Sequence, residues 1–514
     1  MGANYGKSLY KDYELLQSEY DKIKAENELL KKVQQLFIQE KARSEKLEEA
    51  LATKDDAIEA LKKEVLRLNG YLNADGTNSG LPTSKTPLSK KKVIPNSREK
   101  SGKKKGGQPG HAKSKMKAFK EHEVTEVQNH TPQCCPYCGG EAEETEKSII
   151  KDELDYEVVV RKIRHQFVVC QCKQCQKEFH QPIPVRLKEE NQYGSHVQAL
   201  GLALMNIGNV SVNKTRKMIY GLSEEEINPT EGYLIKQQSK AAKELEPFIE
   251  ELRQKSLDLK TLYWDDTVIE INGGKGCLRF YGDDTHALYT AHRYKNKEGL
   301  DEDGILKLLP EGAVVMHDHN KVNYNKEYSY SNIECNVHLL RDLQKTTQHL
   351  QHEWSGKLKE LLTKTNKARN ELIEQGVEAF EDEEIKSFFT KYDQIMLQAG
   401  DENLKDYNKY YGSDERALIL RILEYKDNYM SWVVNFSMPF SNNLSERSLR
   451  GVKSKMKIAG QFMNEESAKN YAKVKSYIET CARNGINETE ALVRLCEGRP
   501  YTVEEIFGRN QGEG

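Results

Sequence analysis

The chain has 514 residues, enough for several domains, and 31% of them are charged. Its 78 basic and 80 acidic side chains give a net charge of -2, so overall charge does not point to a nucleic-acid ligand and local charge has to decide. No stretch reaches the roughly 20 apolar residues of a membrane span and no signal segment begins the chain, which predicts a cytoplasmic protein without a membrane partner. In that compartment the ten cysteines favour metal binding over disulfides.

Residues 1–72 are predicted to form a coiled coil. Apolar side chains recur at heptad spacing, with one phase slip of three residues, at Leu16, Ile23, Leu30, Phe37, Leu47, Leu61 and Leu68. One solvated helix is the alternative, but an apolar seam of this length needs a partner. We therefore expect a homo-oligomer, a parallel coiled coil in which Asn27 sets the register.

Residues 73–120 change to Gly, Ser, Pro and Lys without an apolar period, which predicts a disordered basic linker. A solvated linker without a ligand is one interpretation. A like-charge run that includes Lys103, Lys104 and Lys105 favours a non-specific contact with the phosphates of double-stranded DNA instead.

Residues 121–192 contain two Cys-x-x-Cys pairs, Cys135 with Cys138 and Cys172 with Cys175. Four thiolates are the ligands of a structural Zn²⁺ site, and the apolar runs between the pairs predict a small β-rich zinc-binding module. Buried free cysteines are the alternative. The choice of ligands is open because spare donors lie nearby at Cys134, Cys170, His165 and His180.

Residues 193–258 are helical by their apolar period and carry Lys214, Arg216 and Lys217. The pattern suits a helical DNA-binding domain that reads sequence with a helix-turn-helix, and equally suits a small bundle. From here onward, two acidic motifs each follow a short apolar run.

Residues 259–332 predict three antiparallel strands, a helix over 303–309 and a fourth, parallel strand that ends before Asp318. The first strand ends at Asp265, and a hairpin with its turn at Asn272-Gly273 follows. This is the strand order of a ribonuclease H-like α/β core, in which Asp265 on the first strand lies beside Asp318. Side chains alternate along a strand, so Asp266 points away and is given a supporting role. By the same rule His317 and His319 point away from Asp318, and Asp283 and Asp284 serve a turn.

Residues 333–430 read as a helical insertion, and residues 431–514 as the second part of the core with its closing helices. Glu446 falls in the first turn of a helix that Asn442 or Asn443 caps. A solvated Glu is the usual interpretation. Its basic neighbours favour contact with a phosphate backbone instead, and the spacing of two between the lysines suits an extended segment. These neighbours are Arg447, Arg450, Lys453, Lys455 and Lys457.

Together these motifs resemble the IS66 transposase family. The similarity runs from about residue 70 to the end, through Gly106 to His111, the two cysteine pairs, Asp265-Asp266-Thr267, Asp318 and Asn443 to Arg450. Asp266 stands where the family has Glu. The resemblance implies a DDE recombinase with Asp265, Asp318 and Glu446 as the triad, and accessory proteins of the same element.

We therefore expect a multidomain α+β DNA transposase that binds the ends of its element, cuts the 3′ ends and joins them to target DNA. Three carboxylates suit two Mg²⁺ or Mn²⁺ ions, which prefer hard oxygen ligands. Such a protein would be associated with the nucleoid. A DNA-binding regulator with an inert core is one alternative, and a coiled-coil scaffold without DNA affinity is another.

Overall fold

The computed structural model describes residues 116–509, apart from 142, 144–147, 185, 188 and 410. It also describes ten residues of the predicted coiled coil, all of them helical: Leu16, Gln17, Glu19, Tyr20, Ile23, Lys24, Leu61, Glu64, Val65 and Leu68. The remainder of that coiled coil, and most of the predicted linker with Lys103, Lys104 and Lys105, lie outside the described residues.

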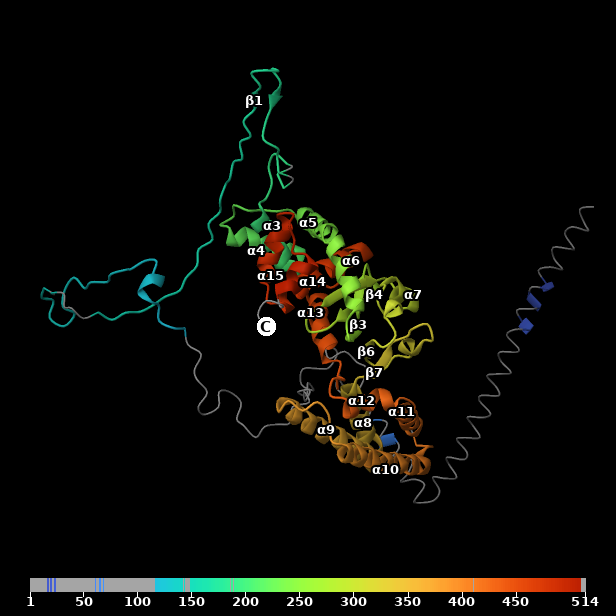
Figure 1. Cartoon of the computed structure of the whole chain (residues 1–514). Helices are drawn as coiled ribbons and strands as arrows, with labels where there is room; N and C mark the ends of the chain where they lie inside the picture. Colours follow the sequence, from blue (N-terminus) through green and yellow to red (C-terminus); the bar gives the residue numbers. More distant parts are fainter. Residues whose placement is uncertain are drawn as a thin grey trace, which may run out of the picture. The chain divides into compact units, whose positions relative to one another are not determined.

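Two compact units divide the described chain. Residues Asn336–Met438 belong to one, and Pro95–Cys335 with Pro439–Gly514 belong to the other. The larger unit holds a mixed α/β fold around one sheet (Figure 1). No helix among the described residues is long and apolar enough to span a membrane.

The sheet of the larger unit has five strands in the order β5-β4-β3-β6-β7. Strands β3, β4 and β5 pair antiparallel, while β6 is parallel to β3 and β7 is parallel to β6. The bounds are β3 Thr261–Ile271, β4 Gly274–Gly282, β5 Ala287–His292, β6 Val314–His317 and β7 Ser331–Glu334. The central strand β3 therefore lies between an antiparallel and a parallel neighbour.

The hairpin between β3 and β4 follows the prediction from its turn residues. Asn272 and Gly273 both have positive φ, 46° and 71°, which is the backbone of a two-residue hairpin turn and the reason for Asn-Gly there. The first expected strand and the hairpin's first arm join into one strand, β3. The helix expected over 303–309 is wrong: α7 ends at Glu302, Gly304 has a φ of 65°, and only the short 3₁₀ turn η4 (Leu306–Leu308) follows.

Helices of the larger unit cover the sheet. Those before the sheet are α3 (Ser195–Asn206), α4 (Val212–Leu222), α5 (Glu231–Glu244) and α6 (Glu246–Leu257), and α7 (Lys297–Glu302) follows β5. Those after the second unit are α13 (Asn443–Ala459), α14 (Glu465–Arg483), α15 (Glu488–Cys496) and α16 (Val503–Gly508). In Figure 1, α14 and α15 lie beside α3 and α5, with α13 against the sheet.

Side chains on the two faces of the sheet enter different clusters. Ile269 and Ile271 of β3 pack with Leu444, Leu449 and Val452 of α13. Leu262 and Trp264, one residue out of phase with them, pack in the cluster of α3, α5, α6 and α15. Because successive side chains of a strand alternate, the odd-numbered residues of β3 face α13.

The second unit is helical and is described by itself. Its helices are α8 (Asn336–Leu350), α9 (Glu353–Glu374), α10 (Asp382–Asp406), α11 (Gly412–Glu424) and α12 (Lys426–Val434). The His352 ring bridges two carboxylates, with Asp406 and Glu415 each 2.8 Å from one ring nitrogen, and the Trp354 indole donates to the same Glu415 at 2.6 Å. This polar core ties the start of α9 to the end of α10 and to α11.

Residues 121–192 carry little regular structure. The strands expected at Tyr156–Val160 and Phe167–Val169 are absent from the described residues, where β1 (Cys170–Gln171) and β2 (Glu178–Phe179) form a two-stranded ladder. Tyr156 and Val159 are exposed. An apolar run forms a stable strand only when a neighbouring strand accepts its backbone hydrogen bonds and one of its faces is packed. The described residues provide neither for these two runs.

Candidate active site on the central strands

Asp265 and Asp266 are neighbours on β3 and point to opposite faces of the sheet. Asp266 lies opposite Arg279 of β4 and accepts a 2.6 Å ion pair from Lys295. Asp265 lies opposite Phe280 and shares its phase with Ile269 and Ile271, which pack against α13. The alternation expected from the sequence therefore agrees with the geometry, and only Asp265 faces α13.

Asp318 follows β6 directly. The parallel ladder of β3 and β6 ends at the pair Tyr263 and Met316, two residues before each aspartate. The charge of Asp318 contributes to the raised pKa of Asp265, so the two carboxylates are near one another. Both residues are partly buried.

The closeness of the two carboxylates changes their chemistry. Burial, with the charges of Asp318 and Asp266, raises the pKa of Asp265 to about 8, against the opposing effects of the Asp266 N–H and Lys453. The Asp266 N–H donates to Asp265 Oδ1 at 2.7 Å. A divalent cation would favour the ionised form of Asp265 beside Asp318, and carboxylate oxygens are the hard ligands that Mg²⁺ and Mn²⁺ prefer. The two side chains therefore fit either ion.

Glu446 lies in the first turn of α13, on the side of the helix that carries Lys453. Residues seven apart lie on one face of a helix, and Lys453 is near enough to Asp265 to lower its pKa. The Glu446 N–H donates to the Asn442 carbonyl at 3.2 Å, so Asn442 begins the helix, although its side chain makes no capping bond. The structure thus places Glu446 on the helix that covers Asp265.

The basic residues after Glu446 are part of α13, so the extended segment expected for them is wrong. Arg447, Arg450, Lys453 and Lys457 are exposed, whereas Lys455 is buried. The Lys455 ammonium donates to the Met205 carbonyl at 2.9 Å and lies 4.9 Å from the centre of the Tyr471 ring. Lys455 therefore holds α13 to α3 and is not available to DNA.

Two histidines beside Asp318 have partners of their own. His317 Nε2 lies 2.8 Å from Asn332 Oδ1, and His319 Nδ1 lies 2.8 Å from Glu334 Oε1. The Tyr324 hydroxyl donates to the same Glu334 oxygen at 2.6 Å. Glu334 is fully buried at the end of β7 and was missed, because the sequence interpretation began the helical insertion at residue 333. Ser331 to Glu334 holds a single apolar residue, Ile333, so the sequence has no alternation that would have revealed this strand.

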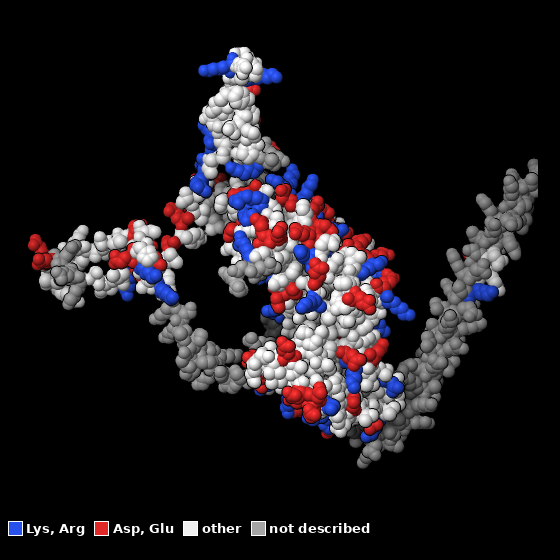
Figure 2. Space-filling view, in the orientation of Figure 1, with Lys and Arg blue, Asp and Glu red and all other residues white. Residues whose placement is uncertain are grey.

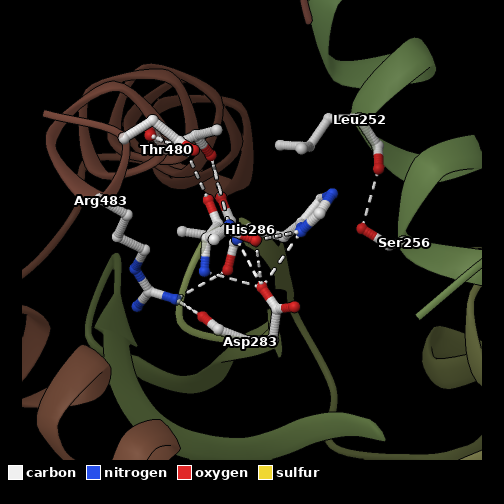
Figure 3. A network of polar contacts seen from close by, with 9 residues as sticks. Leu252, Ser256, Asp283, His286, Thr480 and Arg483 are labelled. Carbon is white, nitrogen blue, oxygen red and sulfur yellow. Dashed lines mark hydrogen bonds and ion pairs between the residues drawn. The ribbon is translucent and has the colours of Figure 1, made fainter. Parts of the chain in front are cut away.

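Asp283 is a structural residue of the turn between β4 and β5, as expected. Its Oδ1 accepts from the Thr285 and His286 N–H groups at 2.8 and 2.7 Å. Burial opposes ionisation there, yet these bonds and His286 lower the pKa of Asp283 to about 2. Figure 3 shows Arg483 of α14 donating to the same turn, at the Asp283 and His286 carbonyls, which ties the turn to the closing helix.

Each predicted zinc-ligand pair forms a tight turn of its own. Gly139 N–H donates to the Cys135 carbonyl at 2.8 Å, and Gln176 N–H donates to the Cys172 carbonyl at 2.9 Å. Backbone N–H groups within each turn lower the pKa of Cys135 and Cys172, as thiolate ligands require. Among the described residues the structure does not gather the two pairs into one group of possible ligands.

Surface charge is mixed on the side of the molecule that Figure 2 shows. Figure 2 shows Lys and Arg interleaved with Asp and Glu over the visible side, in line with the net charge of -2. Lys214 and Lys217 of α4 are exposed, but Arg216 donates to Asn228 at 3.1 Å. The basic stripe on α13 includes Lys453, whose charge acts on Asp265.

One carboxylate on the central strand of a mixed sheet and another directly after the neighbouring strand, beside a basic helix, are typical of proteins that act with divalent cations. Residues 217–470 match the model of the transposase IS66 family. The chain therefore carries a transposase domain of the IS66 family, and the resemblance stated from the sequence motifs is confirmed. No curated protein matches the chain.

Proposed function

We propose that the protein is a DNA transposase that binds the ends of an insertion sequence and catalyses divalent-metal-dependent 3′-end cleavage and strand transfer. The observation that carries the proposal is the nearness of Asp265 on β3 to Asp318 directly after β6, within a domain of a transposase family. The strand order, with three antiparallel strands followed by two parallel ones, supports a ribonuclease H-like core.

The chain's own residues have distinct tasks in this reaction. Asp265, Asp318 and Glu446 would hold two Mg²⁺ or Mn²⁺ ions through hard carboxylate oxygens. When bound, the ions would supply stabilisation of the charge that develops on the reacting oxygens of a phosphodiester. Asp266, paired with Lys295 on the other face, helps to fix the strand and stays outside the metal site.

The DNA backbone contacts are assigned to exposed cations. Arg447, Arg450, Lys453 and Lys457 flank Glu446 on α13, and they would place a phosphate beside the carboxylates. Lys103, Lys104 and Lys105 add a non-specific contact, and the helices of residues 193–258 supply the domain that binds element ends. Binding of this substrate would associate the protein with the nucleoid.

The remaining parts serve assembly. Cys135, Cys138, Cys172 and Cys175 would hold one structural Zn²⁺, and the N-terminal seam would pair two chains. Accessory proteins of the same element are further candidate partners. The rival function is a regulator that binds DNA without cutting it.

A strand-transfer assay on pre-cleaved end DNA, with Mg²⁺ or Mn²⁺, tests the function. Asp265→Asn, Asp318→Asn and Glu446→Gln should each abolish cleavage and joining, because each removes a charge that the cations need. End-DNA binding should stay near the wild-type level, and combined substitutions should cost little more than one.

Asp266→Asn is the matched control, since it changes the neighbouring residue of the same strand and should keep activity. Near-normal joining by any of the three single variants would remove that residue from the triad. A wild-type protein that binds end DNA but never nicks it in either metal would favour the regulator.

A further inference from the structure

Asn442 lies where the elements of the proposed metal site meet. It is fully buried, directly before α13, and its side chain does not cap the helix. Asparagine before a helix normally accepts a hydrogen bond from the first turn. Since Asn442 lacks this bond, its side chain is held by other partners.

Those partners belong to the strands that carry the two aspartates. The Asn442 Nδ2 donates to the Trp264 carbonyl at 2.9 Å and lies 3.5 Å from Asp318 Oδ1. Trp264 precedes Asp265 on β3, just past the point where the β3 ladder with β6 ends at Tyr263. The Asn442 amide therefore donates to a β3 carbonyl just beyond the last residue pair of the β3–β6 ladder.

The backbone of Asn442 links two more elements. Its N–H donates to Cys335 Sγ at 3.2 Å, directly after β7, and its carbonyl accepts from the Glu446 N–H at 3.2 Å. The Cys335 sulfur in turn lies within 4.8 Å of an Asp318 carboxylate oxygen. One residue thus touches β3, the segment after β6, the segment after β7 and the first turn of α13.

The orientation of the amide follows from its partners. A carbonyl and a carboxylate oxygen are acceptors only, so the group that faces them is the Nδ2 donor. Among the residues that the structure describes, no group donates a hydrogen bond to the buried Asn442 Oδ1. A buried unsatisfied acceptor costs about 1–3 kcal/mol, and such a group in a native fold calls for an explanation.

We propose that Asn442 is a positioning residue of the metal site, which sets the Asp318 carboxylate and the start of the Glu446 helix, and whose Oδ1 accepts a hydrogen bond from a hydrated divalent cation. The inference rests on the proposed function. Groups that orient metal ligands in this way typically change metal affinity by about 10–100-fold when they are removed.

Mn²⁺ binding to the full-length protein, followed by the electron paramagnetic resonance signal of free Mn²⁺, tests the role without any turnover. Asn442→Ala should weaken Mn²⁺ binding by about 10-fold or more. Strand transfer should recover substantially at high Mn²⁺, because the carboxylates that bind the cation are intact. A purely structural residue would lower the fraction of folded protein and leave the Mn²⁺ affinity of that fraction unchanged.

Asn206→Ala is the matched control. Asn206 is also buried in the larger unit, but its amide bonds are to Leu202 and Gln238, and its Oδ1 accepts from Gln238 at 3.1 Å. This variant should lose stability and keep wild-type Mn²⁺ affinity. If Asn442→Ala fails to melt cooperatively, Asn442→Ser replaces it in the test. Its hydroxyl keeps one donor but cannot reach both the Trp264 carbonyl and Asp318, so Mn²⁺ affinity should fall by a smaller factor than in Asn442→Ala.

Wild-type affinity in the folded Asn442 variants would overturn the positioning role alone, provided that Asp265→Asn abolishes binding. Absence of Mn²⁺ binding by the wild-type protein would overturn the proposed function, and the role of Asn442 with it.

Discussion

Lys455 shows at the residue scale how helix geometry sorts side chains that look equivalent in the sequence. Lys453, Lys455 and Lys457 are spaced by two, and in a helix each step of two turns the side chain by about 200°. Lys453 and Lys457 therefore share the stripe with Glu446 and Arg450, while Lys455 points inward to Met205 and Tyr471. The same spacing in an extended chain would have placed all three lysines on one side.

Burial, together with the charge of Lys475, lowers the pKa of Lys455 to about 8. The unfolded chain has the ordinary Lys pKa of about 10.4, so the unfolded state binds more protons between these values. The contribution of Lys455 to the free energy of unfolding is greatest above about pH 10.4, decreases as the pH falls, and reaches its minimum below about pH 8. The free energy of unfolding should therefore rise across this window in the wild type relative to Lys455→Met.

Comparison of Lys455→Met with Lys457→Met tests which of the two lysines contacts DNA. Lys455→Met should keep wild-type affinity for end DNA, whereas Lys457→Met, its exposed counterpart, should weaken binding and reduce the salt-dependence slope by about 1. Melting curves over pH and binding titrations at several salt concentrations measure both effects. Equal losses of DNA affinity in the two variants would contradict the inward position of Lys455.

The sequence was sufficient for residues whose role depends on local periodicity. Alternation along β3 separated Asp265 from Asp266, and turn chemistry explained Asp283. It was insufficient for Asn442, because its partners, the Trp264 carbonyl and Asp318, are brought to it only by the packing of α13 on the sheet. Residues that connect elements far apart in the chain have no local pattern that reveals them.

At the scale of elements, the turns were more predictable than the strands between them. Asn272 and Gly273 fixed the β3–β4 hairpin, and the Cys-x-x-Cys pairs form turns that backbone bonds close locally. The apolar runs of residues 148–169 depend on partners, and the expected strands there are absent from the described residues. The helix expected after β5 was placed too late, since Asn296 caps α7 and Gly304 follows its end.

The two cysteine turns should act as halves of one zinc site. Purified protein that has not met a chelator should carry about one zinc per chain, because four thiolates close a tetrahedral site. Cys172→Ser should lower the zinc content and loosen this module, whereas Cys134→Ser, a spare cysteine next to the first turn, should leave it unchanged. Elemental analysis measures the metal; a metal-free wild-type protein would refute the site.

At the scale of the whole molecule, the coiled coil predicted for residues 1–72 should set the oligomeric state. Its described apolar residues, among them Leu16, Ile23, Leu61 and Leu68, are exposed in the single chain. Deletion of residues 1–72 should leave a folded protein of lower mass per particle, because it removes the seam predicted to pair the chains. Light scattering measures the mass, and a mass per particle that still corresponds to the full oligomer would contradict the proposal.

The position of the helical unit Asn336–Met438 between β7 and α13 also fixes the order in which the ribosome delivers the carboxylates. Asp265 and Asp318 emerge early, while Glu446 and Asn442 follow only after the whole unit, a delay on the order of ten seconds at ordinary rates of synthesis. A nascent chain would therefore lack the full set of proposed metal ligands until it is nearly complete. A stop codon within the inserted unit should release a chain that keeps the predicted coiled coil and basic linker but lacks Glu446. Such a fragment should inhibit the intact protein by pairing with it.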